Sequence, residues 1–303
     1  KVAPYFGTVE KPECHMLYNV TTMATTWHTV ATRDIRLLRK QMDIVCALPR
    51  EYTFLNYLRC HDDIGWGLDY ATLKQWGMKE VPHKKYLNDY FQGKVEGSVS
   101  RGELYNEDPV TGDARFCATT ASMCGVESAG FEQNEEKMSW AIRKDLMLHA
   151  YMFTQSGIPM LYSGDEIGQV NDYTYKEDPE KAPDSRYIHR GKFNWDLVEN
   201  IKDKASVQGR IFNGLEDLEK IRRTEAVFNT DAEVYTKDYD DTSILWIVRK
   251  AEGEELHAVF NFSDQGKTIW MPEKAVYTNL VTGVKEEVET VELSGWDFVW
   301  MKR

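Results

Sequence analysis

The chain has 303 residues, a formal net charge of -12 and 42% hydrophobic residues, so it is long enough for two domains and can bury a sizeable core. The acidic balance argues against a nucleic-acid partner, because phosphate binding needs clustered lysine and arginine. No apolar run is long enough to span a membrane, and the 5 cysteines lack the spacing of a disulfide framework or a zinc site.

The start of the chain gives little information on targeting. No secretory leader is recognisable there, and we expect a cytoplasmic protein. The sequence begins at Lys1 rather than at a methionine, which leads us to expect a fragment or a processed product.

The first part of the chain predicts a strand, a helix and a second strand. Residues 15–20 form a short apolar run that is typical of a buried strand. From Thr22 to about Met42, apolar residues recur every three or four positions, which predicts one long helix. Residues 54–60 form an apolar, aromatic run of strand length, as expected for a buried parallel strand.

Polar side chains stand directly after this second strand. His61, Asp62 and Asp63 follow it, close to a glycine. In barrel enzymes the chemistry lies at the C-terminal ends of the strands, which makes these three residues a candidate site. The alternative is an acidic turn that caps a following helix, since aspartate is a good N-cap. Three polar residues alone do not decide between the two interpretations.

Residues 64–134 lose the regular spacing of apolar positions. They are rich in glycine, aspartate, asparagine and tyrosine, and only a short segment near Tyr86 and Phe91 is periodic. A stretch of this length between regular elements is typical of a functional insertion.

Regular spacing returns at Asn134, which is a good N-cap followed by acidic residues that suit the helix dipole. Residues 138–153 carry a helical apolar stripe, and Gly157 is expected to end that helix. A strand then runs from residue 158 into a polar loop, and another helix is expected over 206–223.

From about residue 226 the apolar residues alternate with polar ones, and turn residues separate the short runs. Several short strands at regular spacing predict a small antiparallel β-sandwich. The expected strands are 243–248, 256–262, 268–270 and 296–300.

Leu58–Trp66 (LRCHDDIGW) resembles the seventh-strand motif of the α-amylase superfamily, family 13 of the glycoside hydrolases, and its ending is most similar to the amylosucrase-like branch. The resemblance implies that Asp62 is the carboxylate that stabilises the transition state. It also implies that His61 hydrogen-bonds sugar hydroxyls and that Asp63 faces the neighbouring acceptor subsite.

Two loop segments resemble the same branch. Thr111–Arg115 (TGDAR) is similar to an insertion after the seventh strand and implies that Arg115 lies near the second sugar, although Lys84 and Tyr86 stand where relatives carry arginine and phenylalanine. The alternative for Arg115 is a surface ion pair with Asp113.

The second of these loop segments contains an Asp-Ser-Arg run that ends at Arg186. In the amylosucrase-like branch this run helps to close the donor pocket, where its arginine pairs with an acid elsewhere in the barrel. Arginine suits that task because its planar fork can bind a carboxylate at two points. The alternative for Arg186 is again a surface ion pair.

Two later segments extend the resemblance. Residues 158–168 (IPMLYSGDEIG) are similar to the eighth-strand motif, in which we interpret Asp165 and Glu166 as wall and structural carboxylates rather than as the catalytic pair. Residues 258–264 (AVFNFSD) and the closing 298–300 (FVW) resemble the C-terminal β-domain of the superfamily.

The resemblance implies a fold that is α/β plus all-β: the C-terminal part of a (β/α)8 TIM barrel with an inserted subdomain, followed by a small antiparallel β-sandwich. The expected divisions are a partial barrel over 1–63, the insertion over 64–134, the last barrel elements over 135–225 and the β-sandwich over 226–303.

The same resemblance argues against activity of the chain alone. Retaining glycoside hydrolysis needs a nucleophile and an acid/base, and the Gly-Phe-Arg-x-Asp-like motif that carries the family's nucleophile is missing. We therefore expect the C-terminal portion of a retaining enzyme that acts on sucrose or α-glucans, with no cofactor and no metal. Its expected partners are the sugar and either the missing N-terminal portion or a second copy, which would cover the open sheet.

Three alternatives stay open. The enzyme could be an α-amylase-type hydrolase of maltooligosaccharides. The chain could instead be a non-catalytic glycan-binding module, for which His61, Asp62, Tyr162 and the tryptophan residues would be enough. A truncated product without function is the third alternative.

Overall fold

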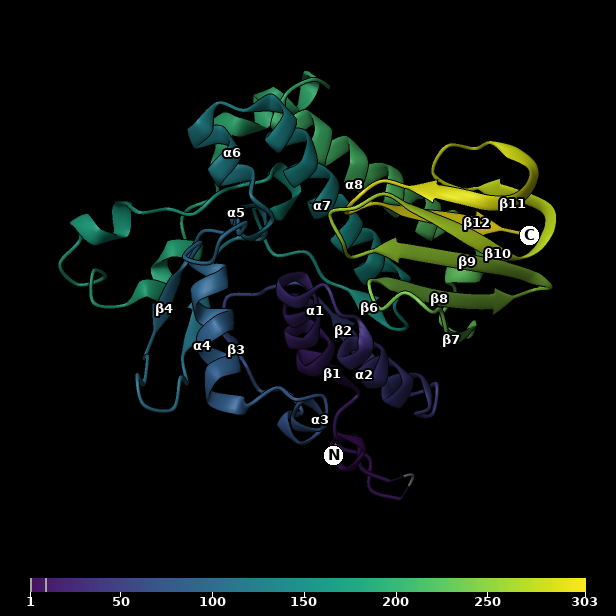
Figure 1. Cartoon of the computed structure of the whole chain (residues 1–303), viewed down its shortest axis with the longest axis horizontal. Helices are drawn as coiled ribbons and strands as arrows, with labels where there is room; N and C mark the ends of the chain where they lie inside the picture. The colour runs from purple at the N-terminus through teal and green to yellow at the C-terminus, as the bar shows by residue number, and fades with distance from the viewer. Residues whose placement is uncertain (1, 9) are drawn as a thin grey trace.

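The computed structural model describes residues 2–8 and 10–303, and Figure 1 shows how their elements are arranged. A three-stranded parallel sheet is made of β1 (Met16–Tyr18), β2 (Thr53–Asn56) and β6 (Ile158–Pro159), with β2 in the middle. An insertion lies on one side of this sheet and a larger antiparallel sheet on the other. The α/β and all-β parts of the prediction are both present.

Four longer helices accompany the parallel sheet: α1 (Val20–Thr32), α2 (Arg36–Cys46), α7 (Glu135–Thr154) and α8 (Val207–Thr224). The N-caps of the last two are satisfied by side chains, because Asn134 accepts a hydrogen bond from the backbone of Lys137 and Ser206 accepts one from Gly209. The predicted helices near 138–153 and 206–223 are therefore confirmed. None of the helices in the described ranges combines the length and apolarity that crossing a bilayer requires.

The single helix predicted from Thr22 to about Met42 is wrong, because two helices occupy this stretch. Arg33 adopts a left-handed backbone conformation with φ 57°, and its N–H donates to the carbonyl of Thr29 at 2.7 Å. This geometry ends α1 in the way that a left-handed C-cap does. The apolar spacing continues across the break, so periodicity alone does not reveal it.

The strand predicted over 54–60 is too long, since β2 ends at Asn56. Beyond it the chain leaves the sheet, and the carbonyl of Leu58 accepts a hydrogen bond from the indole N–H of Trp27 at 2.7 Å. The buried residues Tyr57 and Leu58 thus belong to the loop. Burial of apolar residues in a loop looks the same in the sequence as burial in a strand.

The insertion over 64–134 is more regular than its sequence indicates. It holds a three-stranded antiparallel sheet in the order β3-β5-β4, and its longest helix covers 12 residues. Its elements are β3 (Ile64–Gly65), α3 (Tyr70–Gln75), α4 (Glu80–Phe91), β4 (Glu103–Tyr105), β5 (Arg115–Cys117), α5 (Thr120–Cys124) and α6 (Val126–Glu132).

The C-terminal region forms one six-stranded antiparallel sheet in the order β11-β10-β12-β9-β8-β7. Its strands are β7 (Glu233–Lys237), β8 (Ile244–Ala251), β9 (Glu254–Asn261), β10 (Lys267–Asn279), β11 (Lys285–Leu293) and β12 (Phe298–Lys302). The predicted sandwich of two sheets is therefore corrected to a single sheet. The reason is β10, which pairs with β11 along its length and with β12 near its end, across an irregularity between Trp270 and Ala275.

The C-terminal sheet is bound to the end of α7 through buried polar contacts. Arg249 is 1% exposed, and its guanidinium donates to the carbonyls of Val227, Thr154 and Asn229. The indole N–H of Trp300 donates to the hydroxyl of Thr154 at 3.0 Å. Since a buried arginine is costly unless its donors are satisfied, these contacts fix the sheet against the helix.

Two buried histidines face each other between the insertion and α1. His28 of α1 and His83 of α4 have ring centroids 5.0 Å apart, and among the described residues neither ring nitrogen of His28 has a hydrogen-bond partner. Burial lowers the pKa of His28 from 6.5 to about 3, with His83 adding to the decrease and Asp34 opposing it. Burial also lowers the pKa of His83. Both rings are therefore neutral in the folded protein near neutral pH.

This arrangement predicts acid sensitivity. Below its unfolded pKa near 6.5, His28 takes up a proton in the unfolded chain but not in the folded chain, so stability falls as the pH drops from 6.5 towards 3. When the pH is lowered from 7 to 5, the free energy of unfolding should decrease in both proteins. We expect the decrease to be about 2 kcal/mol smaller in the His28→Leu variant than in the parent chain. Urea unfolding at both pH values measures the difference. Replacing the exposed His15 by leucine is the control, and an equal effect there would contradict the assignment.

Candidate functional site

The site begins where the loops after β2 and β6 meet. Arg59, after β2, pairs with Asp165, after β6, with 2.8 Å between Nε and Oδ1, and both side chains are 3% exposed. The second oxygen of Asp165 accepts from the hydroxyl of Thr120, and Arg59 also donates to the carbonyl of His189. The guanidinium stacks on the ring of Tyr162 at 4.5 Å. The ends of two parallel strands are therefore joined by a satisfied, buried ion pair.

The loop after β2 is also fixed through its backbone. The carbonyl of His61 accepts hydrogen bonds from Nε of Arg190 at 2.6 Å and from Nε2 of His189 at 3.2 Å. Burial lowers the pKa of His189 to about 4, so the ring is neutral and its single proton is on Nε2. The backbone N–H of Asp62 donates to the sulfur of Cys60 at 3.4 Å. These hydrogen bonds fix the backbone of residues 61 and 62, while the side chains of His61 and Asp62 are exposed.

Asp62 lies between two polar side chains but remains accessible. Its carboxylate is 3.5 Å from Nε2 of His61 and 3.7 Å from a terminal nitrogen of Arg190. The side chains of His61 and Asp62 are 62% and 65% exposed. Exposed pairs of this kind contribute little to stability, and their oxygens and nitrogens are available to a ligand.

Arg115 reaches the same place through the small sheet of the insertion. Antiparallel pairing sets Arg115 of β5 opposite Gly65 of β3, and Nε of Arg115 lies 3.6 Å from Oδ1 of Asp63. A β-carbon at residue 65 would lie 2.7 Å from the guanidinium, so glycine permits this approach. Burial raises the pKa of Asp63, and the charge of Arg115 opposes the rise. The alternative partner, Asp113, binds Lys84 at 2.7 Å instead.

Arg186 forms a local ion pair rather than a long-range one. Its guanidinium binds both oxygens of Asp184, at 2.8 and 2.7 Å, and stacks over the ring of Tyr105 at 4.4 Å. Within residues 2–8 and 10–303, its ion pair is with this neighbour and with no acid elsewhere. The predicted distant partner is therefore not found in the described part of the chain.

All five predicted site residues line one cavity of about 570 Å3. They come from the loop after β2 (His61, Asp62 and Asp63), from β5 (Arg115) and from the loop that follows β6 (Arg186). Segments more than a hundred residues apart in the sequence thus supply a single concave surface. The acidic-turn interpretation of residues 61–63 does not account for this convergence.

The sequence analysis missed residues of two kinds. Tyr18 and Tyr57 line the cavity, with ring centroids 5.5 Å apart and planes at 81°, yet both occur in apolar runs that only indicate strands. His189 and Arg190 hold the loop from behind. The sequence indicates these two residues only by their position, three and four residues after Arg186. Their hydrogen bonds to a backbone carbonyl leave no pattern in the sequence.

One cluster in the described ranges brings together three potential metal ligands. Cys60, His61 and Asp62 each offer a donor atom, and these atoms lie within 4.8 Å of one another. Metal ligation by cysteine requires the thiolate, whereas burial raises the pKa of the Cys60 thiol. The donor set therefore fits a metal poorly.

Known proteins with similar sequences are sugar phosphorylases. The chain is 23% identical over 301 residues to the glucosylglycerate phosphorylase of Escherichia coli (strain K12), which covers 98% of the chain and 50% of that protein. It is 21% identical over 317 residues to the glucosylglycerate phosphorylase of Spirochaeta thermophila, with the same coverage. The chain thus spans about half the length of the curated relatives it matches. No family model matches it.

Solved structures with the same fold are also sugar-active enzymes. Sucrose 6F-phosphate phosphorylase from Thermoanaerobacter thermosaccharolyticum superposes with a TM-score of 0.60 at 16% identity, over 90% of this chain and 46% of that one. Cyclic α-maltosyl-(1→6)-maltose hydrolase from Arthrobacter globiformis, in complex with its namesake sugar, gives a TM-score of 0.56 at 15% identity, over 97% and 46%.

The fold of the chain is similar to that of about half of each of these solved enzymes. The relatives and the structural neighbours are members of the α-amylase superfamily. The resemblance seen in the sequence is confirmed: the chain is similar to the C-terminal portion of α-amylase superfamily enzymes.

The ion pair between Arg59 and Asp165 should be a main support of this site. We expect Arg59→Met to lower the free energy of unfolding by about 3–5 kcal/mol, because Asp165 would remain as a buried, unpaired charge. The double variant Arg59→Met/Asp165→Leu should recover at least half of that loss. Denaturant unfolding of both variants tests this, and a double variant less stable than Arg59→Met would contradict it.

Proposed function

We propose that this chain is the C-terminal portion of a retaining enzyme that acts on α-glucosides, and that the 570 Å3 cavity is part of its sugar site. The observation that carries the proposal is the convergence of His61, Asp62, Asp63, Arg115 and Arg186 on that cavity. Their residue types suit a sugar, since carboxylates and imidazole bind hydroxyls, and the two tyrosine rings offer an apolar wall.

Asp62 is the proposed stabiliser of the transition state. Cleavage of a glucosidic bond builds positive charge on the sugar ring as an oxocarbenium-like species. A carboxylate fixed beside that ring lowers the energy of this charge, provided that its position is set in advance. The backbone contacts of His61 and Asp62 supply such a position. Asp62 cannot also serve as nucleophile and acid/base, so the proposal assigns those roles to carboxylates outside this chain.

Arg115 and Asp63 are the proposed acceptor-side pair. They lie 3.6 Å apart at the cavity wall formed by the insertion. Arg186, which is held by Asp184, is proposed to close the donor side. The guanidinium of Arg186 has further N–H donors besides the two that donate to Asp184. These donors could bind an acid of the missing portion.

The proposed donor is sucrose, because the motifs at 58–66, 111–115 and 184–186 are most similar to the amylosucrase-like branch. The solved neighbour named as a sucrose 6F-phosphate phosphorylase supports a sucrose-type donor. Relatives named as phosphorylases add inorganic phosphate to the acceptors to be tested, beside water and glucans. A neighbour named as a maltosyl-maltose hydrolase favours the alternative, a hydrolase of maltooligosaccharides.

The parallel sheet supports the proposal that a larger barrel surrounds it. Its outer strands β1 and β6 have no further partner among the described strands, and Met16, Tyr18 and Ile158 on them are more than two-fifths exposed. Such edges pair with further strands when these are available. We propose the preceding half of a (β/α)8 barrel as the occupant, which agrees with a match to half of each relative. The divisions at residues 63, 134 and 225 and the cytoplasmic location belong to this proposal.

The first test compares the chain alone with the chain supplied with its N-terminal portion. Alone it should release no glucose or fructose from sucrose above background, because two of the three required carboxylates are absent. Co-expression with the preceding half should restore turnover, measured with water, phosphate and maltooligosaccharides as acceptors. Robust cleavage by the isolated chain would contradict the proposal. Sugar binding without turnover in the complete protein would identify a glycan-binding module.

In the complete protein, Asp62→Asn should lower kcat about 10²–10³-fold, the range seen when one preorganised electrostatic stabiliser is lost. Arg115→Ala should instead raise KM for the acceptor more than it lowers kcat. Steady-state kinetics with varied acceptor concentration separates the two effects. Asp178→Asn is a matched control, because Asp178 forms a surface pair with Lys181 away from the cavity. If Asp62→Asn behaved like this control, the assignment of Asp62 would fall.

A further inference from the structure

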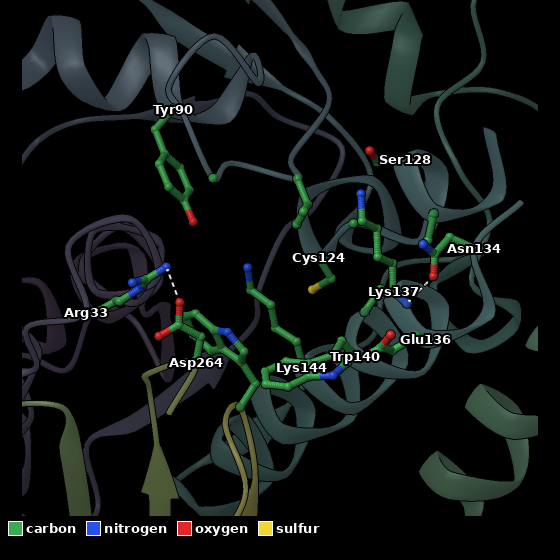
Figure 2. Close-up of a pocket in the computed structure, with 16 residues that line it drawn as sticks. Arg33, Tyr90, Cys124, Ser128, Asn134, Glu136, Lys137, Trp140, Lys144 and Asp264 are labelled. Atoms are coloured by element: carbon green, nitrogen blue, oxygen red, sulfur yellow. Dashed lines mark hydrogen bonds and ion pairs between the residues drawn. The ribbon is translucent and has the colours of Figure 1, made fainter. Parts of the chain in front are cut away.

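A second cavity of about 360 Å3 lies between the insertion, helix α7 and the C-terminal sheet region. Figure 2 shows its lining side chains, which reach it from separate elements: Arg33 at the end of α1, Tyr90 from α4, Trp140 and Lys144 from α7, and Asp264 and Trp296 from loops of the C-terminal region. None of the five residues of the glucoside site lines this cavity. It is a separate feature of the molecule.

Lys144 is the unusual member of this lining. Its residue is 4% exposed, and its ammonium projects from α7 into the cavity, between the Arg33–Asp264 pair and Cys124 (Figure 2). Among residues 2–8 and 10–303 it has no hydrogen-bond acceptor and no carboxylate partner. Its ammonium lies over the ring of Trp296, 4.4 Å from Nζ to the centroid.

The other cations of the lining are already neutralised. Arg33 pairs with Asp264 at 2.8 Å, and Lys137 pairs with Glu132. Burial lowers the pKa of Lys144 to about 8, which reflects how unfavourable its lone charge is in this environment. Near pH 7 the amine still carries its proton for most of the time. In the described part of the chain, Lys144 is thus the lining cation without a counter-charge.

A purely structural role accounts poorly for Lys144. A buried ammonium without a counter-charge is unfavourable, and a cation–π contact offsets only part of that cost. A methionine or leucine at the same position of α7 would fill the space without that cost. The room beside Nζ provides an explanation, since an anion bound there would supply the missing charge.

We propose that this cavity binds a small organic carboxylate whose apolar body lies against Trp140 and Trp296. The ammonium of Lys144 would bind the carboxylate, and the two indoles would cover a ring or a short hydrocarbon. A single unpaired cation, together with Glu136 in the same lining, favours a monoanion over a phosphate dianion. A cavity of about 360 Å3 is at the small end of ligand sites and suits a ligand with one ring.

Benzoate is a suitable probe, and benzyl alcohol is its uncharged analogue. Ligand-observed NMR titration of the chain should detect benzoate at millimolar concentrations or below and should show at least tenfold weaker binding of benzyl alcohol. Lys144→Met should weaken benzoate at least tenfold and leave benzyl alcohol unchanged. Lys137→Met is the matched control on the same helix: it removes a lining lysine that is already paired, so benzoate binding should change less than twofold. Equal benzoate affinity in the parent chain and in Lys144→Met would overturn the proposal.

A second measurement uses the parent chain and so does not depend on a variant folding. Acetylation with N-hydroxysuccinimidyl acetate at pH 8, mapped by mass spectrometry, should modify Lys144, and saturating benzoate should slow that modification at least fivefold. The exposed Lys220 should react at the same rate with and without benzoate. If benzoate gives Lys144 no protection, or if the reagent does not reach Lys144 at all, the cavity is not the proposed site.

Discussion

The contact between Arg59 and Asp165 joins the loops that follow the central strand and one edge strand of a short parallel sheet. At 2.8 Å and almost full burial, the two charges are desolvated together, and each depends on the other for a partner. The hydroxyl of Thr120 and the carbonyl of His189 satisfy further atoms of the pair. A buried pair of this kind contributes less to net stability than to fixing one arrangement of the groups around it. Here it fixes the relative positions of three loops.

The accessible part of the site depends on that buried support. His61 and Asp62 are largely exposed, but the backbone between them is held by Arg190, by neutral His189 and by the sulfur of Cys60. Exposed side chains on a fixed backbone can meet a ligand without a large loss of conformational entropy. The insertion adds Arg115 from a strand rather than from a loose loop, which limits its movement as well.

The sequence was most informative where local chemistry decides the structure. Asn134 begins α7 because its side chain caps a free N–H group, and this cap was predicted from the residue type. The motif around Asp62 led to the cavity through its resemblance to the α-amylase superfamily, since the position of three polar residues after a strand did not decide by itself. These inferences needed no knowledge of distant contacts.

The misses have two causes. The break at Arg33 is local, but it depends on a left-handed residue that the apolar spacing conceals. The long β10 joins strands that we expected in two sheets, and β11 has too many charged residues to read as a strand. The second cavity depends on loops from the C-terminal region meeting α7. The pairing of β10 and this cavity are set by residues far apart in the sequence, so local patterns do not reveal them.

The contacts of Arg249 and Trp300 with Thr154 couple the local unfolding of the C-terminal sheet to that of the end of α7. Thr154 is the last residue of α7 and stands just before β6, whose loop carries Asp165. Releasing the C-terminal sheet would leave one donor of Arg249 and the indole N–H of Trp300 without the acceptors that Thr154 provides, so the sheet and the end of α7 should open in one event. Amide hydrogens near residue 154 would then exchange at the same slow rate as those of β8 and β9, as members of one cooperative unit. In that sense the C-terminal sheet belongs to the folding unit that carries the candidate site.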